Sequence, residues 1–226
     1  MRIFAISDLH LPAREKPMDV FGAHWENHFE RIADDWREKV GQDDVVLLPG
    51  DLTWAMRLED ALEDLRRVGE LPGRKLILRG NHDYWWSGIG QVRRALPEGM
   101  FALQNDAMTL EGYIFAGSRG WTLPGGDCTK DDLKIYERER LRLEMSLKTA
   151  RRLSEVMPLI VMMHYPPFSA ACEGFTDILS AYRADMCVYG HLHGAGLQFG
   201  FTGERGGIMY HQVSCDGLGF RLRQII

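Results

Sequence analysis

The sequence has few cysteines, no long apolar run and no excess of basic residues. Its four cysteines are scattered without a C-x-x-C pair, which excludes a disulfide-rich secreted scaffold and indicates reduced thiols in a cytoplasmic protein. The longest apolar stretch, Leu159 to Met163, is far too short to span a bilayer, so we expect no membrane association. We also expect no signal peptide, because the first residues lack a basic segment followed by a long apolar core.

A net charge of −5 argues against a broad basic surface, so nucleic acid is not the expected partner, although a local basic groove stays compatible with this charge. The 226 residues, 45% of them hydrophobic, suffice for one buried core. No linker, internal repeat or low-complexity tract divides the chain. We therefore expect a single domain over residues 1–226, and the oligomeric state stays open.

Short apolar runs alternate with amphipathic helical patterns along the chain. The longest helical pattern follows Thr129, a typical N-cap, with Asp127, Asp131 and Asp132 interpreted as acids of the helix start, and it ends before Pro158. Two shorter helices are predicted at 29–40 and 58–65. Strands are predicted at 2–6, 45–48, 75–78, 113–116, 159–163, 186–189 and 208–213. This alternation predicts an α/β fold in which helices cover the sheets.

Ionisable and amide side chains gather directly after these predicted strands. An apolar strand that ends in such a group is costly unless the group meets a partner. The carboxyl ends of strands in open α/β sheets are also where ligand sites form. Mixed oxygen and nitrogen ligands suit divalent Mn, Fe, Zn or Co better than Ca. The residues concerned are Asp8, His10, Asp51, Asn81, His82, Asp83, His164, His191 and His193.

This ordered set resembles the calcineurin-like metallophosphoesterases over residues 8–193. The motifs are Asp8-x-His10, Gly50-Asp51, Gly80-Asn81-His82-Asp83, a lone His164 and Gly190-His191-x-His193. The resemblance implies a four-layer α/β/β/α sandwich of two mixed sheets flanked by helices. It also implies two divalent metal ions, Mn, Fe or Zn, with Mn favoured.

The resemblance assigns a role to each matching residue. Three residues would hold the first metal: Asp8, His10 and His193. Three others would hold the second: Asn81, His164 and His191. Asp51 would bridge the two ions, and His82, paired with Asp83, would be the catalytic histidine that binds no metal.

These roles predict a metal-dependent phosphoesterase, a phosphatase or a phosphodiesterase, that hydrolyses a small phosphate ester by attack of a metal-bridging hydroxide. The presence of His82 does not indicate whether the substrate is a monoester or a diester. The competing hypotheses are a protein-binding scaffold on the same fold, a nuclease, and a metal-dependent hydrolase of carbon esters or amides. Metal content separates the scaffold from the enzymes.

Two arginines are candidates for substrate binding. Arg79 precedes the Gly80-Asn81-His82-Asp83 motif, as does the phosphate-binding arginine of the phosphoprotein phosphatases in the same superfamily. The Asp-Arg-Gly of those phosphatases is missing after Asp51, which argues against a phosphoprotein substrate. Arg119 is a second candidate. Arg79 can equally be a surface residue, and for Arg119 the surface interpretation is favoured.

Several residues near the motifs have simpler explanations. His24 and His28 lie one helical turn apart but are interpreted as a helix face rather than a metal pair. His211 is expected in the core or at its rim. The aromatic residues after the motifs could line a substrate pocket, whereas Trp85 and Trp86 are expected to pack the loops in place.

Overall fold

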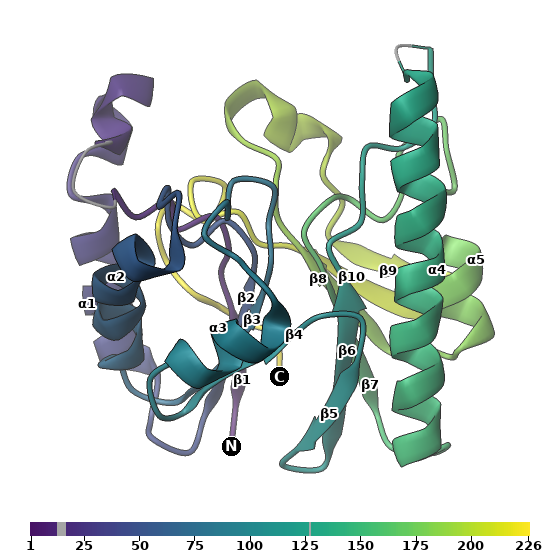
Figure 1. Ribbon diagram of the computed structural model, residues 1–226, viewed down its shortest axis with the longest axis horizontal. Coiled ribbons are helices and arrows are strands. Elements are labelled where there is room, and N and C mark those ends of the chain that lie inside the picture. The colour runs from purple at the N-terminus through teal and green to yellow at the C-terminus, as the bar shows by residue number, and fades with distance from the viewer. Residues whose placement is uncertain (13–16, 127) are drawn as a thin grey trace.

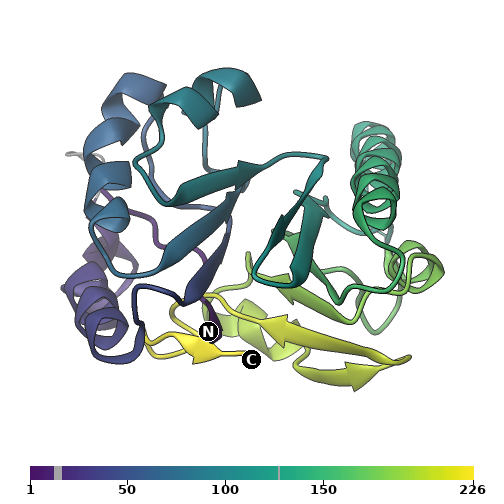
Figure 2. The same cartoon turned by 90° about the horizontal axis from the view of Figure 1, so that it is seen from below.

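The structure is a computed structural model that describes residues 1–12, 17–126 and 128–226. Asp127, expected at the start of the long helix, lies outside the described residues. Two β-sheets face each other, and helices cover the outer face of each (Figures 1 and 2). The expected four-layer α/β/β/α sandwich of two mixed sheets is therefore confirmed.

The first sheet has five strands in the order β11-β1-β2-β3-β4. Strands β1 to β4 are parallel, and β11 pairs antiparallel with β1 at the edge. Helices α1 (His28–Lys39), α2 (Leu58–Gly69) and α3 (Ile89–Ala95) lie on its outer side (Figure 1). The strands are β1 (Ile3–Ala5), β2 (Val45–Pro49), β3 (Arg74–Leu78), β4 (Met100–Leu103) and β11 (Arg223–Gln224).

The second sheet has six strands in the order β5-β6-β7-β8-β10-β9, with β6, β7, β8 and β10 parallel. Helices α4 (Lys130–Leu153) and α5 (Thr176–Ala181) cover its outer face. The strands are β5 (Ala107–Leu110), β6 (Tyr113–Ser118), β7 (Leu159–Met163), β8 (Met186–Tyr189), β9 (Gly203–Arg205) and β10 (Ile208–Gln212). Three short 3₁₀ helices complete the described elements: η1 (Met18–Phe21), η2 (Ala23–Trp25) and η3 (Gly194–Phe199).

The core has one apolar layer between the sheets and one beneath each set of helices. Leu47 and Leu76 of the first sheet pack in the same buried cluster as Phe115, Ile160 and Val188 of the second. Every residue of β2 and β7 is buried, as expected for central strands covered on both faces. Among the residues that the structure describes, no helix is long and apolar enough to cross a membrane.

All seven predicted strands are present. The strands that the sequence pattern missed, β4, β5, β9 and β11, are short, and all four lie at sheet edges, where the apolar signal is weak. Thr129 caps α4 as predicted: its side chain accepts from Asp132 N, and the Asp132 carboxylate accepts from Thr129 N. The apolar stripe of α4 is buried in the middle, whereas Leu133 and Leu153 at its ends are 40% and 48% exposed.

One buried charge links β3 to α2. Lys75 is 2% exposed, and its Nζ donates to the carbonyl oxygens of Gly69 and Leu71 at the C-terminal end of α2. The ammonium thus pairs carbonyls that a helix end leaves without an intrahelical donor.

We expect Lys75→Met to lower the free energy of unfolding by about 2 kcal/mol, because the two buried carbonyls lose a charged donor. Urea unfolding at neutral pH measures this difference. Lys134→Met is the matched control, since the Lys134 side chain is 78% exposed. A Lys75→Met protein as stable as the control would show that the ammonium contributes nothing net.

Candidate metal centre

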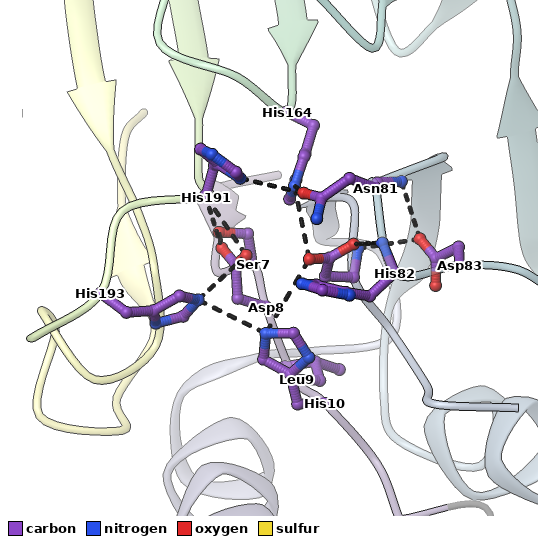
Figure 3. Close-up of polar contacts among 12 residues, drawn as sticks. Ser7, Asp8, Leu9, His10, Asn81, His82, Asp83, His164, His191 and His193 are labelled. Atoms are coloured by element: carbon purple, nitrogen blue, oxygen red, sulfur yellow. Dashed lines mark hydrogen bonds and ion pairs between the residues drawn. The ribbon is translucent and has the colours of Figure 1, made fainter. Parts of the chain in front are cut away.

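The seven expected metal ligands lie close together where central strands of both sheets end (Figure 3). The segments after β1, β2 and β3 come from the first sheet, and those after β7 and β8 come from the second. Residues far apart in the sequence thus meet because the carboxyl ends of the parallel strands share one edge of the sandwich. The prediction that these strand ends converge is confirmed.

One group of ligand atoms is formed by Asp8, His10 and His193. His193 Nε2 lies 3.3 Å from Asp8 Oδ1 and 3.4 Å from His10 Nε2. One donor atom from each residue lies within 4.8 Å of the others, which is close enough for all three to bind one ion. Asp8 and His10 are almost fully buried, so their charge and lone pairs have little access to water.

A second group forms around His164. Its Nε2 lies 2.6 Å from Asn81 Oδ1 and 3.4 Å from Asp51 Oδ2. Asn81 Oδ1 also lies 2.9 Å from His191 Nδ1. An oxygen facing two imidazole nitrogens and a carboxylate is a donor set that suits a divalent cation of the Mn, Fe or Zn type.

Two carboxylates connect the groups. Asp51 Oδ2 lies 3.9 Å from His10 Nε2 in the first group and 3.4 Å from His164 Nε2 in the second. Asp8 belongs to both sets of mutually close donor atoms, once with His10 and His193 and once with Asp51 and His164. Two buried carboxylates this close together need positive charge between them. The residues therefore fit a pair of neighbouring cations.

The loops that carry these ligands adopt uncommon backbone conformations. Asp8, His10, Asp51 and His191 have positive φ angles of 60°, 44°, 54° and 73°. For residues with a Cβ such angles cost about 1–3 kcal/mol each and are concentrated at functional sites. The turns aim side chains from the strand ends into one volume, at the expense of local stability.

Two glycines of the sequence motifs have no room for a side chain. A Cβ on Gly80 would collide with the Asp51 carboxylate, and a Cβ on Gly190 would collide with Ser7 and Asp8. Neither glycine has a positive φ. Here glycine serves close approach of the backbone to the ligands, rather than an unusual turn angle.

The imidazoles of the cluster differ in pKa. Burial lowers the pKa of His10 to about 4, and burial together with His164 lowers that of His191 to about 4. Burial also disfavours the protonated form of His164 and His193, but the nearby carboxylates stabilise that form more strongly. Asp51 raises the pKa of His164 to about 9, and Asp216 and Asp8 raise that of His193 to about 10. At neutral pH these values leave His10 and His191 neutral and His164 and His193 protonated.

The expected pairing of Asp83 with the His82 ring is not among the hydrogen bonds of the described residues, in which Asp83 binds backbone nitrogens and Trp85. Its carboxylate accepts from the backbone nitrogens of Asp51 and Gly80, both at 2.8 Å, and from Leu52 N at 2.9 Å. Trp85 Nε1 donates to it at 2.9 Å. Because these donors fix the carboxylate in the core, Asp83 holds the Asp51 turn against the end of β3.

His82 lies at the edge of the cluster. Its backbone nitrogen donates to Asp51 Oδ1 at 2.8 Å, and its ring centroid is 4.5 Å from that of Trp54 and 5.7 Å from that of His10. The imidazole therefore borders the candidate metal ligands without belonging to either group of ligand atoms. This placement agrees with a role other than metal binding.

Asp216 is a site residue that the sequence interpretation missed. Its Oδ1 lies 2.9 Å from His193 Nδ1, on the side of the ring opposite Asp8 and His10. A carboxylate in this position fixes the orientation of a ligand imidazole and raises its basicity. The sequence did contain a signal for this residue, because Asp216 follows the last predicted strand in the same way as the other candidate ligands follow earlier strands.

An apolar cavity of about 320 Å³ opens beside His10, His82 and His193. Trp54 stacks on His10 with ring centroids 4.7 Å apart, and Trp25 also lines the cavity. Part of the expected aromatic pocket is therefore present next to the metal ligands. Trp85 and Trp86 are buried instead, as expected for residues that pack the loops.

The two candidate arginines face a different cavity. Arg79 and Arg119 line a space of about 300 Å³ whose described lining includes none of the seven expected ligands. None of its described lining residues lines the aromatic cavity.

The remaining histidines lie outside the two ligand groups. His28 is buried, and its ring nitrogens lie 2.8 Å from Leu9 O and 3.2 Å from Trp25 O, so it connects α1 to the loop after β1. His24 lines the aromatic cavity. His211 lies on β10, half-buried at the rim of the core.

Comparison with known proteins agrees with this arrangement. A structure of a protein of unknown function from Aquifex aeolicus has the same fold, with a TM-score of 0.51 and 16% sequence identity over 99% of this chain and 95% of that chain. A search of curated protein sequences found no match. The sequence model of the calcineurin-like phosphoesterases matches residues 1–195. Since that match covers most of the chain, the protein belongs to the calcineurin-like phosphoesterase family.

Proposed function

We propose that residues 1–226 form one domain that hydrolyses a small phosphate ester with two divalent metal ions, Mn being favoured. Family membership supports metal-dependent phosphoester hydrolysis. The observation that carries the two-ion proposal is the pair of ligand groups that share Asp8, with Asp51 within 4 Å of a histidine in each. The four unpaired cysteines support a reducing, cytoplasmic setting.

The proposed ligand sets combine these groups with the contacts of Asn81. Asp8, His10 and His193 would hold one ion, and Asn81, His164 and His191 would hold the other, with Asp51 in reach of both. Bound divalent ions supply an acidified water and offset the charge that develops on the phosphoryl oxygens.

The side chains of the protein hold the reacting groups in position and supply a proton to the leaving oxygen. His82 borders both the ligand cluster and the aromatic cavity, so its imidazole can protonate the leaving oxygen of an ester whose organic group lies in that cavity. The Trp54 ring packs against one side of the His82 imidazole and so fixes its position. Asp83 acts on the reaction indirectly, by holding the turn that carries Asp51.

The test is hydrolysis of bis(p-nitrophenyl) phosphate and p-nitrophenyl phosphate after metal removal and Mn²⁺ readdition. We expect Asp51→Asn to lose bound metal and turnover together. His82→Ala keeps its metal and loses about 10²–10⁴-fold in kcat, the usual contribution of a positioned acid.

His211→Gln is the control, because His211 belongs to neither ligand group, and it keeps wild-type metal content and turnover. Full activity of His82→Ala would remove the proposed acid. Wild-type protein that binds no Mn²⁺ would contradict the proposed enzymatic function and favour the protein-binding scaffold. The ratio of diester to monoester turnover decides between phosphodiesterase and phosphatase.

Asp216 gives a second test of the His193 site. We expect Asp216→Asn to weaken Mn²⁺ binding by about 10–100-fold, the usual effect of removing a partner of a ligand imidazole. Calorimetric Mn²⁺ titration of the metal-free protein measures the affinity. Asp43→Asn is the control, because it removes one exposed carboxylate elsewhere, and it leaves the Mn²⁺ affinity unchanged. Equal affinities in both variants would show that Asp216 does not support the metal site.

The raised pKa values of His164 and His193, about 9 and about 10, predict a pH dependence of metal binding. Both imidazoles are protonated at neutral pH in the metal-free protein, and a proton must leave before each nitrogen can bind an ion. Mn²⁺ affinity therefore rises with pH from 6 to 9, by about tenfold per unit for each proton released. Titrations in buffers of different ionisation enthalpy count the protons, and a flat profile would refute the prediction.

A further inference from the structure

A second cavity, the arginine cavity, is lined by residues at the ends of β3, β4 and β6 and on helix α4. It has a volume of about 300 Å³. Four arginines line it: Arg79 after β3, Arg119 after β6, and Arg138 and Arg142 on α4. A chain with a net charge of −5 has thus collected four guanidinium groups around one space.

Among the described lining residues, Glu139 is the one carboxylate that balances these arginines. Glu139 is 1% exposed and contacts Arg142 Nη1 at 2.6 Å, with Arg119 and Arg138 at 3.9 Å and 4.0 Å. Three guanidinium groups therefore share one carboxylate, and Arg79 is the fourth cation. Burial lowers the pKa of Arg119, and the nearby Arg79 and Arg138 lower it further against the effect of Glu139. The described lining carries an excess of positive charge.

Two buried polar atoms in the lining have no partner among the described residues. They are Nε of Arg79 and Oγ of Ser118, a residue only 1% exposed. A buried donor without a partner costs about 1–3 kcal/mol. Stacking on Trp121, with Cζ 4.6 Å from the ring centroid, fixes the Arg119 guanidinium as well. Fixed guanidinium and hydroxyl donors around a space suit a tetrahedral oxyanion.

The arginine cavity adjoins the candidate metal centre through the backbone. Arg79 immediately precedes Gly80-Asn81, and the carbonyl of Arg119 accepts from the backbone nitrogens of His164 and Tyr165 at 3.0 Å each. We propose that this cavity binds a phosphoryl anion. That anion is either the second phosphate of a bisphosphorylated substrate or free phosphate. The first source rests on the proposed function, whereas the anion site itself does not.

The test is calorimetric titration of inorganic phosphate into the metal-free protein, which needs no catalysis. We expect wild type to bind phosphate, Arg138→Gln to bind it about tenfold more weakly, and Ser118→Ala several-fold more weakly. Arg152→Gln on the same helix is the charge-matched control, since Arg152 is exposed and outside the lining, and it binds as wild type does. Thermal unfolding checks that each variant is folded.

Phosphate binding that is absent in wild type, or unchanged in both Arg138→Gln and Ser118→Ala, would overturn the proposal. An equal loss in Arg152→Gln would do so too, because it would show a general charge effect. If Arg138→Gln does not fold, Ser118→Ala decides, since it removes only a hydroxyl.

The source of the anion is assigned with the Mn²⁺-loaded protein and a nucleoside 5′-monophosphate beside the 3′,5′-bisphosphate. A roughly tenfold rise in KM for the bisphosphate alone in Arg138→Gln supports the cavity as a substrate subsite. Equal KM values for the two esters in wild type, with phosphate binding still sensitive to Arg138→Gln, support it as a site for free phosphate.

Discussion

The arrangement of the molecule depends on two carboxylates that lie almost out of reach of water. Asp8 is fully buried and Asp51 is 1% exposed, and a carboxylate in such surroundings is stable only with positive charge or hydrogen-bond donors around it. In the protein alone the donors to Asp8 are His193, the backbone nitrogen of His191 and the Ser7 hydroxyl. Those to Asp51 are His164 and the backbone nitrogen of His82. A cation replaces part of that compensation, which couples metal binding to the protonation of the histidines.

The surrounding structure can be understood as support for these two side chains. Left-handed backbone at Asp8 and Asp51 aims them inward, and Gly80 and Gly190 leave room for their oxygens. Asp83 is a third buried carboxylate with a different task, since it binds backbone nitrogens of two loops and so joins the ends of β2 and β3. Burial of the apolar layers on both sides of each sheet offsets the free-energy cost of these strained turns.

Two cavities of similar size but opposite character flank the centre. The aromatic cavity begins at His10, His82 and His193, and it suits the organic part of an ester. The arginine cavity lies on the side of α4 and suits an anion. Residues of α4 therefore have two tasks, because the helix covers the second sheet with one face and brings Arg138 and Arg142 to the cavity with another.

The sequence by itself determined the central strands, the long helix with its Thr129 cap, and which polar residues follow the strands. Apolar periodicity and polar residues at strand ends are local signals that can be recognised along the chain. Short strands such as β11 depend on a neighbour and carry no such signal. Only the tertiary structure decided which atoms meet. It placed Asp83 against backbone nitrogens, paired Asp216 with His193, and put Arg79 and Arg119 in a cavity that α4 also lines. These contacts join residues distant in the chain, and the packing of the two sheets, rather than spacing along the sequence, sets the distances between them.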